Sequence, residues 1–111
     1  MENAAVRDRI GVEIARNDVV LFMKGTPQFP QCGFSAAVAE ILSELDVRFA
    51  AVNVLDDDAI RQGVKEFSSW PTIPQLYVKG EFVGGCDIVR EMHQSGELDK
   101  LLQEKGVSVG K

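Results

Sequence analysis

The sequence predicts an α/β fold in which helices flank a four-stranded mixed sheet. Apolar residues alternate along the chain between helical spacing and short strand-like runs, in the order α-β-α-β-α-β-β-α-α. The first half therefore contains a βαβ unit with parallel strands, and the second half contains an antiparallel hairpin. The chain has 111 residues, of which 45% are hydrophobic, so a single domain with its own core accounts for its length.

The first helix and the first strand follow from their apolar spacing. Within residues 4–16, Val6, Ile10 and Ile14 lie four positions apart with charged residues between them, as in an amphipathic helix. Residues 19–23 form a continuous apolar run that begins with two β-branched residues. Such a run is typical of a buried central strand.

In the middle of the chain, helical and strand-like segments continue to alternate. The apolar face of the helix that begins after Cys32 is formed by Val38, Ile41, Leu42 and Leu45. Residues 48–54 are expected to form the second strand. Asp56-Asp57-Asp58 then supplies a cap and negative charge, both of which favour a helix N-terminus. The apolar positions of that third helix are Ile60, Val64 and Phe67.

The second half begins with a hairpin and ends with two helices. Residues 75–78 and 81–84 are strand-like, and the Lys79-Gly80 pair between them is a hairpin signal. The apolar faces of the two trailing helices are Ile88, Val89 and Met92, and then Leu98, Leu101 and Leu102. Gly106 is placed to end the last helix.

The residue best suited to a chemical role is Cys32. It follows a proline-containing loop over residues 24–31 and stands at the start of a helix. A helix N-terminus presents unpaired N–H groups and partial positive charge, so it lowers the pKa of a thiol placed there. Ser35 occupies the position where a dithiol oxidoreductase carries its second cysteine. The thiolate therefore pairs with an external group: a small thiol, a partner protein or a metal.

Several other residues are expected to gather around Cys32. Strand ends and helix N-termini share one edge of an α/β sheet, and this brings together Lys24 after the first strand and Arg61 in the third helix. Pro74 and the pair Cys86-Asp87 belong to the same edge. Cations, an exposed backbone edge and a helix end match an anionic peptide that carries a thiol.

Two loops leave alternatives open. In Trp70-Pro71-Thr72-Ile73-Pro74, a cis bond before a proline would expose the peptide groups of Ile73 to an extended ligand, whereas a trans loop is the commoner arrangement. Gly84-Gly85-Cys86-Asp87 either offers backbone N–H groups to a carboxylate or forms a plain turn with Asp87 as the helix N-cap. Cys86 is a second redox thiol, a metal ligand or a small buried residue.

Composition limits the classes of function. The formal net charge of −5 argues against nucleic acid as a partner. No apolar run reaches the roughly 20 residues of a membrane helix, the first residues lack the apolar core of a signal peptide, and two cysteines do not make a disulfide framework. We expect a protein of a reducing compartment, namely the cytoplasm, or an organellar matrix if the chain is the mature form of a eukaryotic protein.

Four motifs in order carry a resemblance to a known family. They are Lys24-Gly25-Thr26-Pro27, Cys32-Gly33-Phe34-Ser35, the segment from Trp70 to Tyr77, and Gly84-Gly85-Cys86-Asp87-Ile88. Together they resemble the CGFS-type monothiol glutaredoxins, in a single-domain bacterial or organellar form. The likeness places a glutaredoxin domain at residues 6–107.

The resemblance implies a thioredoxin-like fold with a cis bond at Pro74. It implies that glutathione is bound by Lys24, Arg61, the backbone of Ile73, and the pair Cys86-Asp87. It also implies that Cys32 ligates a [2Fe–2S] cluster that bridges two protomers, with two glutathione thiolates completing the coordination. Relatives of this type pass clusters to apo iron–sulfur proteins and pair with BolA-family proteins.

Two functions compete on this basis. The first is an iron–sulfur cluster carrier, in which the cluster is labile because half of its ligands are exchangeable. The second is a glutathione-dependent thiol-disulfide oxidoreductase that removes glutathione from proteins through Cys32. The loop from Gly25 to Gln31 resembles an insertion that separates CGFS proteins from active dithiol glutaredoxins, which favours the carrier. Whether the chain is also a weak enzyme stays open from the sequence.

Overall fold

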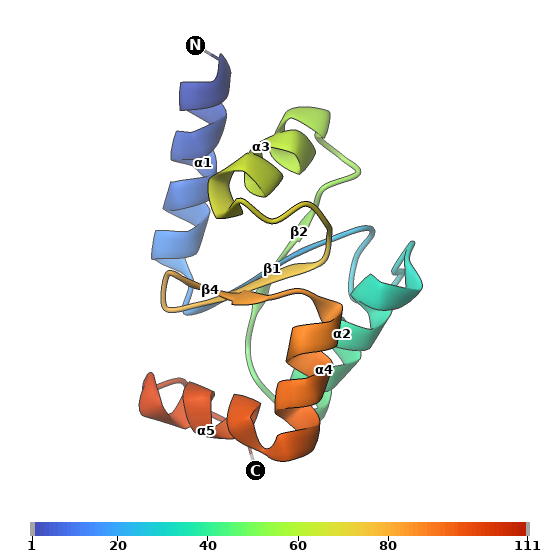
Figure 1. Ribbon diagram of the computed structural model, residues 1–111, viewed down its shortest axis with the longest axis vertical. Helices are drawn as coiled ribbons and strands as arrows, with labels where there is room; N and C mark the ends of the chain where they lie inside the picture. Colours follow the sequence, from blue (N-terminus) through green and yellow to red (C-terminus); the bar gives the residue numbers. More distant parts are fainter. Residues whose placement is uncertain (1, 111) are drawn as a thin grey trace.

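A computed structural model describes residues 2–110 and shows a mixed sheet covered by helices on both faces (Figure 1). The elements are α1 (Glu2–Arg16), β1 (Val19–Met23), α2 (Gly33–Glu44), β2 (Ala50–Asn53), α3 (Asp58–Ser68), β3 (Gln75–Val78), β4 (Glu81–Gly84), α4 (Cys86–Ser95) and α5 (Glu97–Glu104). This order is the one that the sequence predicts. Within the described residues, no helix is both long enough and apolar enough to cross a membrane.

The sheet has four strands in the order β2-β1-β3-β4. β1 and β2 are parallel, whereas β1 with β3 and β3 with β4 are antiparallel. The βαβ unit and the hairpin are therefore confirmed. Every residue of β1 is buried, as expected for a central strand. In the hairpin turn, Lys79 and Gly80 both have positive φ angles, of 51° and 83°, which is the geometry of a two-residue type I′ turn.

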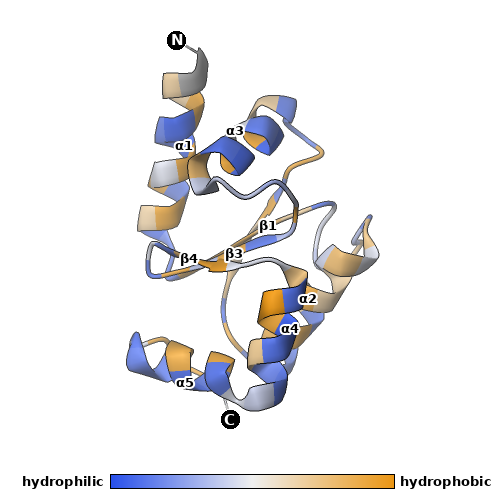
Figure 2. Cartoon of the chain, viewed as in Figure 1, coloured by the Kyte–Doolittle hydropathy of each residue, from blue (hydrophilic) through white to orange (hydrophobic). Residues whose placement is uncertain are grey.

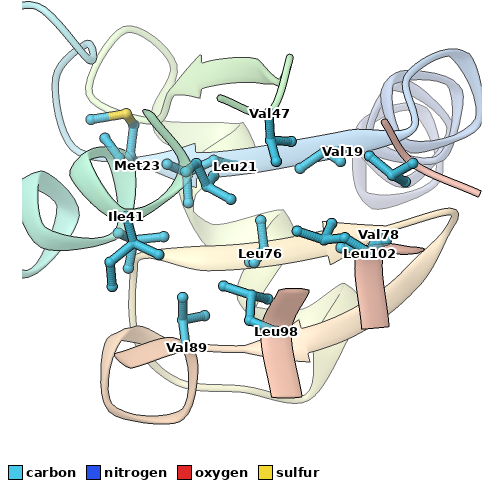
Figure 3. Close-up of a cluster of buried hydrophobic side chains, with 14 of the residues drawn as sticks. Val19, Leu21, Met23, Ile41, Val47, Leu76, Val78, Val89, Leu98 and Leu102 are labelled. Atoms are coloured by element: carbon cyan, nitrogen blue, oxygen red, sulfur yellow. The ribbon is translucent and has the colours of Figure 1, made fainter. Parts of the chain in front are cut away.

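The alternation of side chains along the strands divides the core into two layers. On one face, α2, α4 and α5 pack on Leu21, Leu76 and neighbouring strand residues (Figure 3). On the other face, α1 and α3 pack on Val20, Phe22 and Tyr77. The helix α5 turns its apolar side to the sheet and its hydrophilic side away from it (Figure 2). With a layer of helices on each face, the sheet can present ligand-binding groups only at its strand ends.

One boundary differs from the prediction. Residues 48–54 were expected to form the second strand, but β2 covers only Ala50–Asn53. Pairing with β1 runs only from Val20↔Ala50 to Met23↔Asn53, so Arg48, Phe49 and Val54 lie outside the paired residues. Only the pairing with β1 sets where the strand begins and ends.

The loop that leads from β1 to Cys32 is tightly ordered. The N–H of Gln31 donates to the carbonyl of Lys24 at 2.9 Å, and Thr26 and Phe29 exchange two backbone hydrogen bonds of 3.1 and 3.2 Å. The side-chain oxygen of Asn53 accepts from the N–H of Gly25 at 2.9 Å, which fastens this loop to the end of β2. The approach to Cys32 is therefore a folded turn that is anchored to the sheet.

Gly25 is a point at which this loop tolerates no side chain. Its φ angle is +92°, and an added Cβ would lie 2.6 Å from backbone atoms of both Gln31 and Phe29. We therefore expect Gly25→Ala to lower the free energy of unfolding by about 2 kcal/mol or more, because the left-handed conformation and the crowding both oppose it. Chemical denaturation monitored by circular dichroism measures the change.

The matched control is Gly11→Ala, at a helical position where an added Cβ meets nothing within 4 Å. This variant is expected to gain about 0.5–1 kcal/mol, since alanine favours the helix over glycine. Equal stability of the two variants would contradict the loop geometry described above.

Candidate functional site

Cys32 is the N-cap of α2, with extended backbone angles of φ −153° and ψ 133°. The first turn of this helix carries no acidic residue, so nothing there opposes a negative charge on the sulfur. The pKa of Cys32 is lowered, chiefly because the backbone N–H of Ser35 donates to the thiolate, with further contributions from the N–H of Phe34, the hydroxyl of Ser35 and the charge of Lys24. Partial burial opposes these effects without cancelling them. Cys32 is therefore a partly exposed thiol that favours its reactive thiolate form.

Ser35 has a structural role that the sequence did not reveal. Its side chain is fully buried, and its oxygen accepts a hydrogen bond of 3.0 Å from the N–H of Lys24. This bond ties the end of β1 to the first turn of α2. Sequence reasoning treated Ser35 only as the place where a second thiol is missing, because a contact between β1 and α2 leaves no mark in the residue spacing.

A cavity of about 720 Å³ lies beside Cys32. Its lining residues are Lys24, Cys32, Phe34, Lys65, Trp70, Pro71, Thr72, Ile73, Pro74, Gly85, Cys86, Asp87 and Ile88. Five of the six residues singled out from the sequence, all except Arg61, are among them. A hollow of about 780 Å³ at the opposite end of the sheet is lined partly by Arg16 and Arg48 and contains no thiol, so the chemistry belongs to the cavity at Cys32.

Arg61 does not line this cavity, although it was expected at the same edge. It is partly buried on α3, and its Nε atom has no hydrogen-bond partner among residues 2–110. Lys65, one helical turn further along α3, lines the cavity instead. The sequence holds a signal for it, since residues four apart on a helix share a face, but Lys65 was not singled out.

The Ile73–Pro74 bond is cis, so the cis alternative is confirmed and the trans loop is wrong. The loop that precedes it is held by Gln75, a fully buried polar residue. Its amide nitrogen donates to the carbonyls of Trp70 and Thr72 at 3.1 and 3.2 Å. Gln75 thereby orders the wall of the cavity that contains Ile73, and its only sequence signal was an isolated polar residue at the start of an apolar strand.

Gly85 brings the end of β4 close to this loop. An added Cβ would lie 3.1 Å from the indole nitrogen of Trp70 and 3.3 Å from the carbonyl oxygen of Pro74. Gly85 is also the N-cap of α4. The alternative in which Asp87 caps this helix is therefore wrong. Asp87 is an exposed residue in the first turn of α4, because the chain enters the helix one residue before Cys86.

Cys86 lies at the cavity but differs from Cys32 in its environment. It is buried and belongs to the core cluster on the α2, α4 and α5 side of the sheet. Burial raises the pKa of the Cys86 thiol, and the nearby thiolate of Cys32 and the carboxylate of Asp87 raise it further, against the opposing charge of Arg90. The environment of Cys86 supports the packing role over that of a second reactive thiol.

The residues present fit a metal cluster only if other groups complete it. Within residues 2–110, no group of three or more histidine, cysteine, aspartate or glutamate side chains could hold a metal ion. The single histidine, His93, lies instead on α4, 3.7 Å from Glu44. One copy of the chain therefore presents one accessible thiolate, Cys32, and any metal centre here requires external ligands.

The chain resembles known proteins along most of its length. The Glutaredoxin family model matches residues 19–83. "Probable monothiol glutaredoxin 2" of Rickettsia typhi is 56% identical over 92 residues, which cover 83% of each chain. "Monothiol glutaredoxin-5, mitochondrial" of Saccharomyces cerevisiae is 56% identical over 102 residues, covering 89% of this chain and 68% of the yeast protein.

Solved structures agree with these relatives. A monomeric truncated mutant of Trypanosoma brucei 1-C-Grx1 superposes with a TM-score of 0.87 and 43% identity, covering 95% of this chain and 96% of that one. A buckwheat glutaredoxin–glutathione complex superposes with a TM-score of 0.84 and 25% identity, covering 95% and 94%. The glutaredoxin version of the thioredoxin-like fold, expected from the sequence, is thereby confirmed.

The two thiols are expected to differ in their reaction with iodoacetamide. Because the pKa of Cys32 is lowered, its alkylation continues at pH values below the ordinary thiol pKa of about 8.5 and slows only as the pH falls through the lowered value. Cys86, buried and with a raised pKa, reacts far more slowly throughout that range. Peptide mass spectrometry after timed alkylation measures both rates.

In denaturant both thiols should titrate alike, which provides the control. Equal rates for the two cysteines in the folded protein at pH 7 would show that the helix N-terminus does not activate Cys32.

Proposed function

The chain belongs to the glutaredoxin family, in its monothiol group, and we propose that it carries a labile [2Fe–2S] cluster held between two copies of the chain with glutathione. The observation that supports this most directly is the single accessible thiolate, Cys32, with no second reactive thiol beside it. A [2Fe–2S] centre is usually held by four thiolates. Two copies of Cys32 and two small external thiols make that number.

The cavity beside Cys32 suits glutathione as the external thiol. Glutathione is a peptide with two carboxylates, and Lys24 and Lys65 line the cavity with no ion-pair partner among the residues described. The N-terminus of α4, at Cys86-Asp87, offers backbone N–H groups to a carboxylate. The backbone of Ile73 lies along the same wall and is suited to pair with an extended peptide. The buckwheat neighbour is itself described as a complex with glutathione.

Arg61 was expected to bind glutathione, but it does not line the cavity. It stands outside the cavity, with a buried Nε that lacks a partner in the described structure. We propose that its guanidinium turns toward the ligand when the peptide is bound, which places Arg61 in the glutathione site. Without ligand, the positive charge at the cavity comes from Lys24 and Lys65, which line it.

This arrangement accounts for release as well as binding. Two of the four ligands come from a small molecule that exchanges with the surroundings, so the cluster can pass to a protein that offers more thiolates. Apo iron–sulfur proteins are the proposed recipients, and BolA-family proteins are a proposed partner. The protein acts in a reducing compartment, the cytoplasm or an organellar matrix, where Cys32 stays a free thiol.

A glutathione-dependent oxidoreductase is the second candidate, and the activated thiolate favours it. Cys32 would attack the sulfur of a glutathionylated protein, forming a mixed disulfide with glutathione and releasing the protein thiolate. A second glutathione thiolate would then attack that disulfide, yielding oxidised glutathione and free Cys32. Ser35 offers no thiol for this second step. We expect the ordered Gly25–Gln31 turn and the exposed Phe34 to crowd the approach of a second glutathione.

Reconstitution with iron, sulfide and glutathione under anaerobic conditions tests the carrier. The wild-type chain should gain the absorption bands of a [2Fe–2S] centre and elute as a dimer, whereas the apo chain elutes as a monomer. Cys32→Ser should abolish assembly, because no other accessible thiolate remains. Cys86→Ser should retain most of the cluster, because Cys86 packs in the core.

The holo protein is then mixed with an apo-ferredoxin to measure cluster transfer. Separately, the apo chain and a dithiol glutaredoxin are compared in their rates of reduction of a glutathione mixed disulfide. Ready cluster transfer with slow disulfide reduction supports the carrier. Loss of the cluster in Cys86→Ser would overturn the ligand assignment. The carrier would be overturned if the apo chain reduces the disulfide as fast as the dithiol glutaredoxin and the holo chain cannot deliver its cluster.

Lys24→Ala should weaken retention of the cluster at limiting glutathione. Lys24 is partly buried and close enough to Cys32 to lower the pKa of its thiol, so its loss removes a charge-assisted contact with the ligand. The glutathione concentration that retains half of the cluster is expected to rise roughly five- to tenfold. Lys100→Ala, on the exposed surface of α5, is the control and should behave as wild type. Identical titrations for the two variants would remove Lys24 from the site.

A further inference from the structure

The hollow at the end of the sheet away from Cys32 has no part in the proposed function. Its volume is about 780 Å³, which lies within the range of sites that bind small molecules. Its lining comes from the end of α1, the loop before β2 and the segment that follows α5, and includes Arg16, Arg48, Phe49 and Val107. We call it the arginine hollow.

The two arginines of this hollow are not neutralised by the fold. Arg16 and Arg48 are exposed, and neither makes an ion pair among residues 2–110. Arg16 stands in the last turn of α1, where the helix carbonyls favour a cation. Arg48 has no such partner, because it lies between α2 and β2, outside any helix or strand. Two guanidinium groups on one hollow supply the donors that phosphate and carboxylate groups require.

Two carboxylates also line the hollow, but they do not cancel the arginines. Asp18 pairs at 3.1 Å with Lys79, which is not among the lining residues. Asp46 lies against the backbone of Gly110, where an added Cβ would clash with the Asp46 side chain. The lining therefore keeps an excess of positive charge on a chain whose formal net charge is −5. Such a local reversal of charge favours an anion as the occupant.

The walls of the hollow are fixed before a ligand binds. Val107 is buried, and its N–H donates to the carbonyl of Leu102 at 2.8 Å. The N–H of Gly110 donates to the carbonyl of Leu45 at 3.3 Å, which ties the C-terminal segment to the end of α2. Val47, in the loop before β2, is buried as well. Walls that are already ordered reduce the entropic cost of binding.

We propose that the arginine hollow binds a small phosphate monoester, whose phosphate is held by the guanidinium groups of Arg16 and Arg48. A phosphate monoester carries nearly two negative charges at pH 7 and has three acceptor oxygens, which match two planar sets of donors. A single carboxylate carries one charge and is satisfied by one guanidinium. The volume of the hollow is far larger than a phosphate ion, so it also has room for the organic part of the ester.

Phe49 and Val107 give the hollow an apolar side for that organic part. Phe49 is partly buried and packs on the core, yet it also lines the hollow. A planar ring of the ligand can therefore lie on Phe49 while its phosphate reaches the neighbouring Arg48. Asn17 and Ser108 line the hollow too, and their side chains can donate to ring or sugar oxygens. The lining thus favours a ligand of the size of a mononucleotide over a free phosphate ion.

Adenosine monophosphate (AMP) is the probe, and adenosine and inorganic phosphate are its two halves. Binding to the full apo chain is measured by calorimetry and located by NMR shifts of the backbone amides. AMP should bind about tenfold more tightly than either half, or better, and should shift the amides of Phe49 and Ser108. Its affinity should fall as the salt concentration is raised, because exposed guanidinium groups are screened. Since no cluster is present, a failure of cluster assembly leaves this result unaffected.

Substitutions of the arginines test their part directly. Arg16→Gln and Arg48→Gln should each weaken AMP binding about tenfold or more, because each removes a charge-assisted pair of hydrogen bonds. Arg48→Lys should recover only part of the loss, since an ammonium keeps the charge but not the planar set of donors. Arg7→Gln is the matched control and should bind AMP as wild type does. Arg7 is exposed on the same helix as Arg16 and lines a different hollow.

Four results would overturn the inference. Equal affinities for Arg16→Gln, Arg48→Gln and Arg7→Gln would show that the arginine hollow does not hold the phosphate. Inorganic phosphate that binds as tightly as AMP would leave only a surface that attracts any anion. NMR shifts confined to residues around Cys32, with competition by glutathione, would place AMP in the cavity of the proposed function. No detectable binding of AMP at millimolar concentration would leave the hollow without a ligand of this class.

Discussion

The hydrogen bond from the N–H of Lys24 to the hydroxyl oxygen of the buried Ser35 joins the end of β1 to the start of α2, and the site is arranged around that junction. β1 is the central strand, buried along its whole length, so its end is fixed by both core layers. The hydrogen bond to Ser35 fixes the first turn of α2 to this strand end. Cys32, the N-cap, is thereby held where backbone N–H groups lower the pKa of its thiol.

The opposite wall of the cavity is fixed by a second set of buried contacts. Gln75, at the start of β3, holds the carbonyls of Trp70 and Thr72, and the absence of a side chain at Gly85 lets the end of β4 approach Trp70 and Pro74. The wall with Cys32 is thus fixed to β1, and the wall with Ile73 is fixed to β3 and β4 of the same sheet. This spacing keeps a slot open between a thiolate and a backbone edge without any ligand present, which lowers the ordering cost of binding a flexible peptide.

The sequence was sufficient for what depends on local spacing and insufficient for what depends on contacts between distant elements. The hairpin at Lys79-Gly80 and the position of Cys32 at a helix start follow from neighbouring residues, and both are confirmed. The replacement of Arg61 by Lys65 in the cavity depends on the rotation of α3 against the sheet, which no local pattern encodes. The role of Ser35 was hidden for the same reason, since its partner lies eleven residues earlier in the chain.

Under the proposed function, the two cysteines explain why one copy of the chain supplies only part of a cluster site. Cys86 borders the same cavity as Cys32 and is close enough for the Cys32 thiolate to raise the pKa of its thiol. Packing against the core nevertheless keeps it buried and protonated, so it does not compete as a ligand. A second accessible thiolate from each chain would supply all four ligands from protein, and the cluster would then have no exchangeable side. Under the proposed function, the burial of Cys86 is what leaves two coordination positions to glutathione, and with them a route by which the cluster can leave.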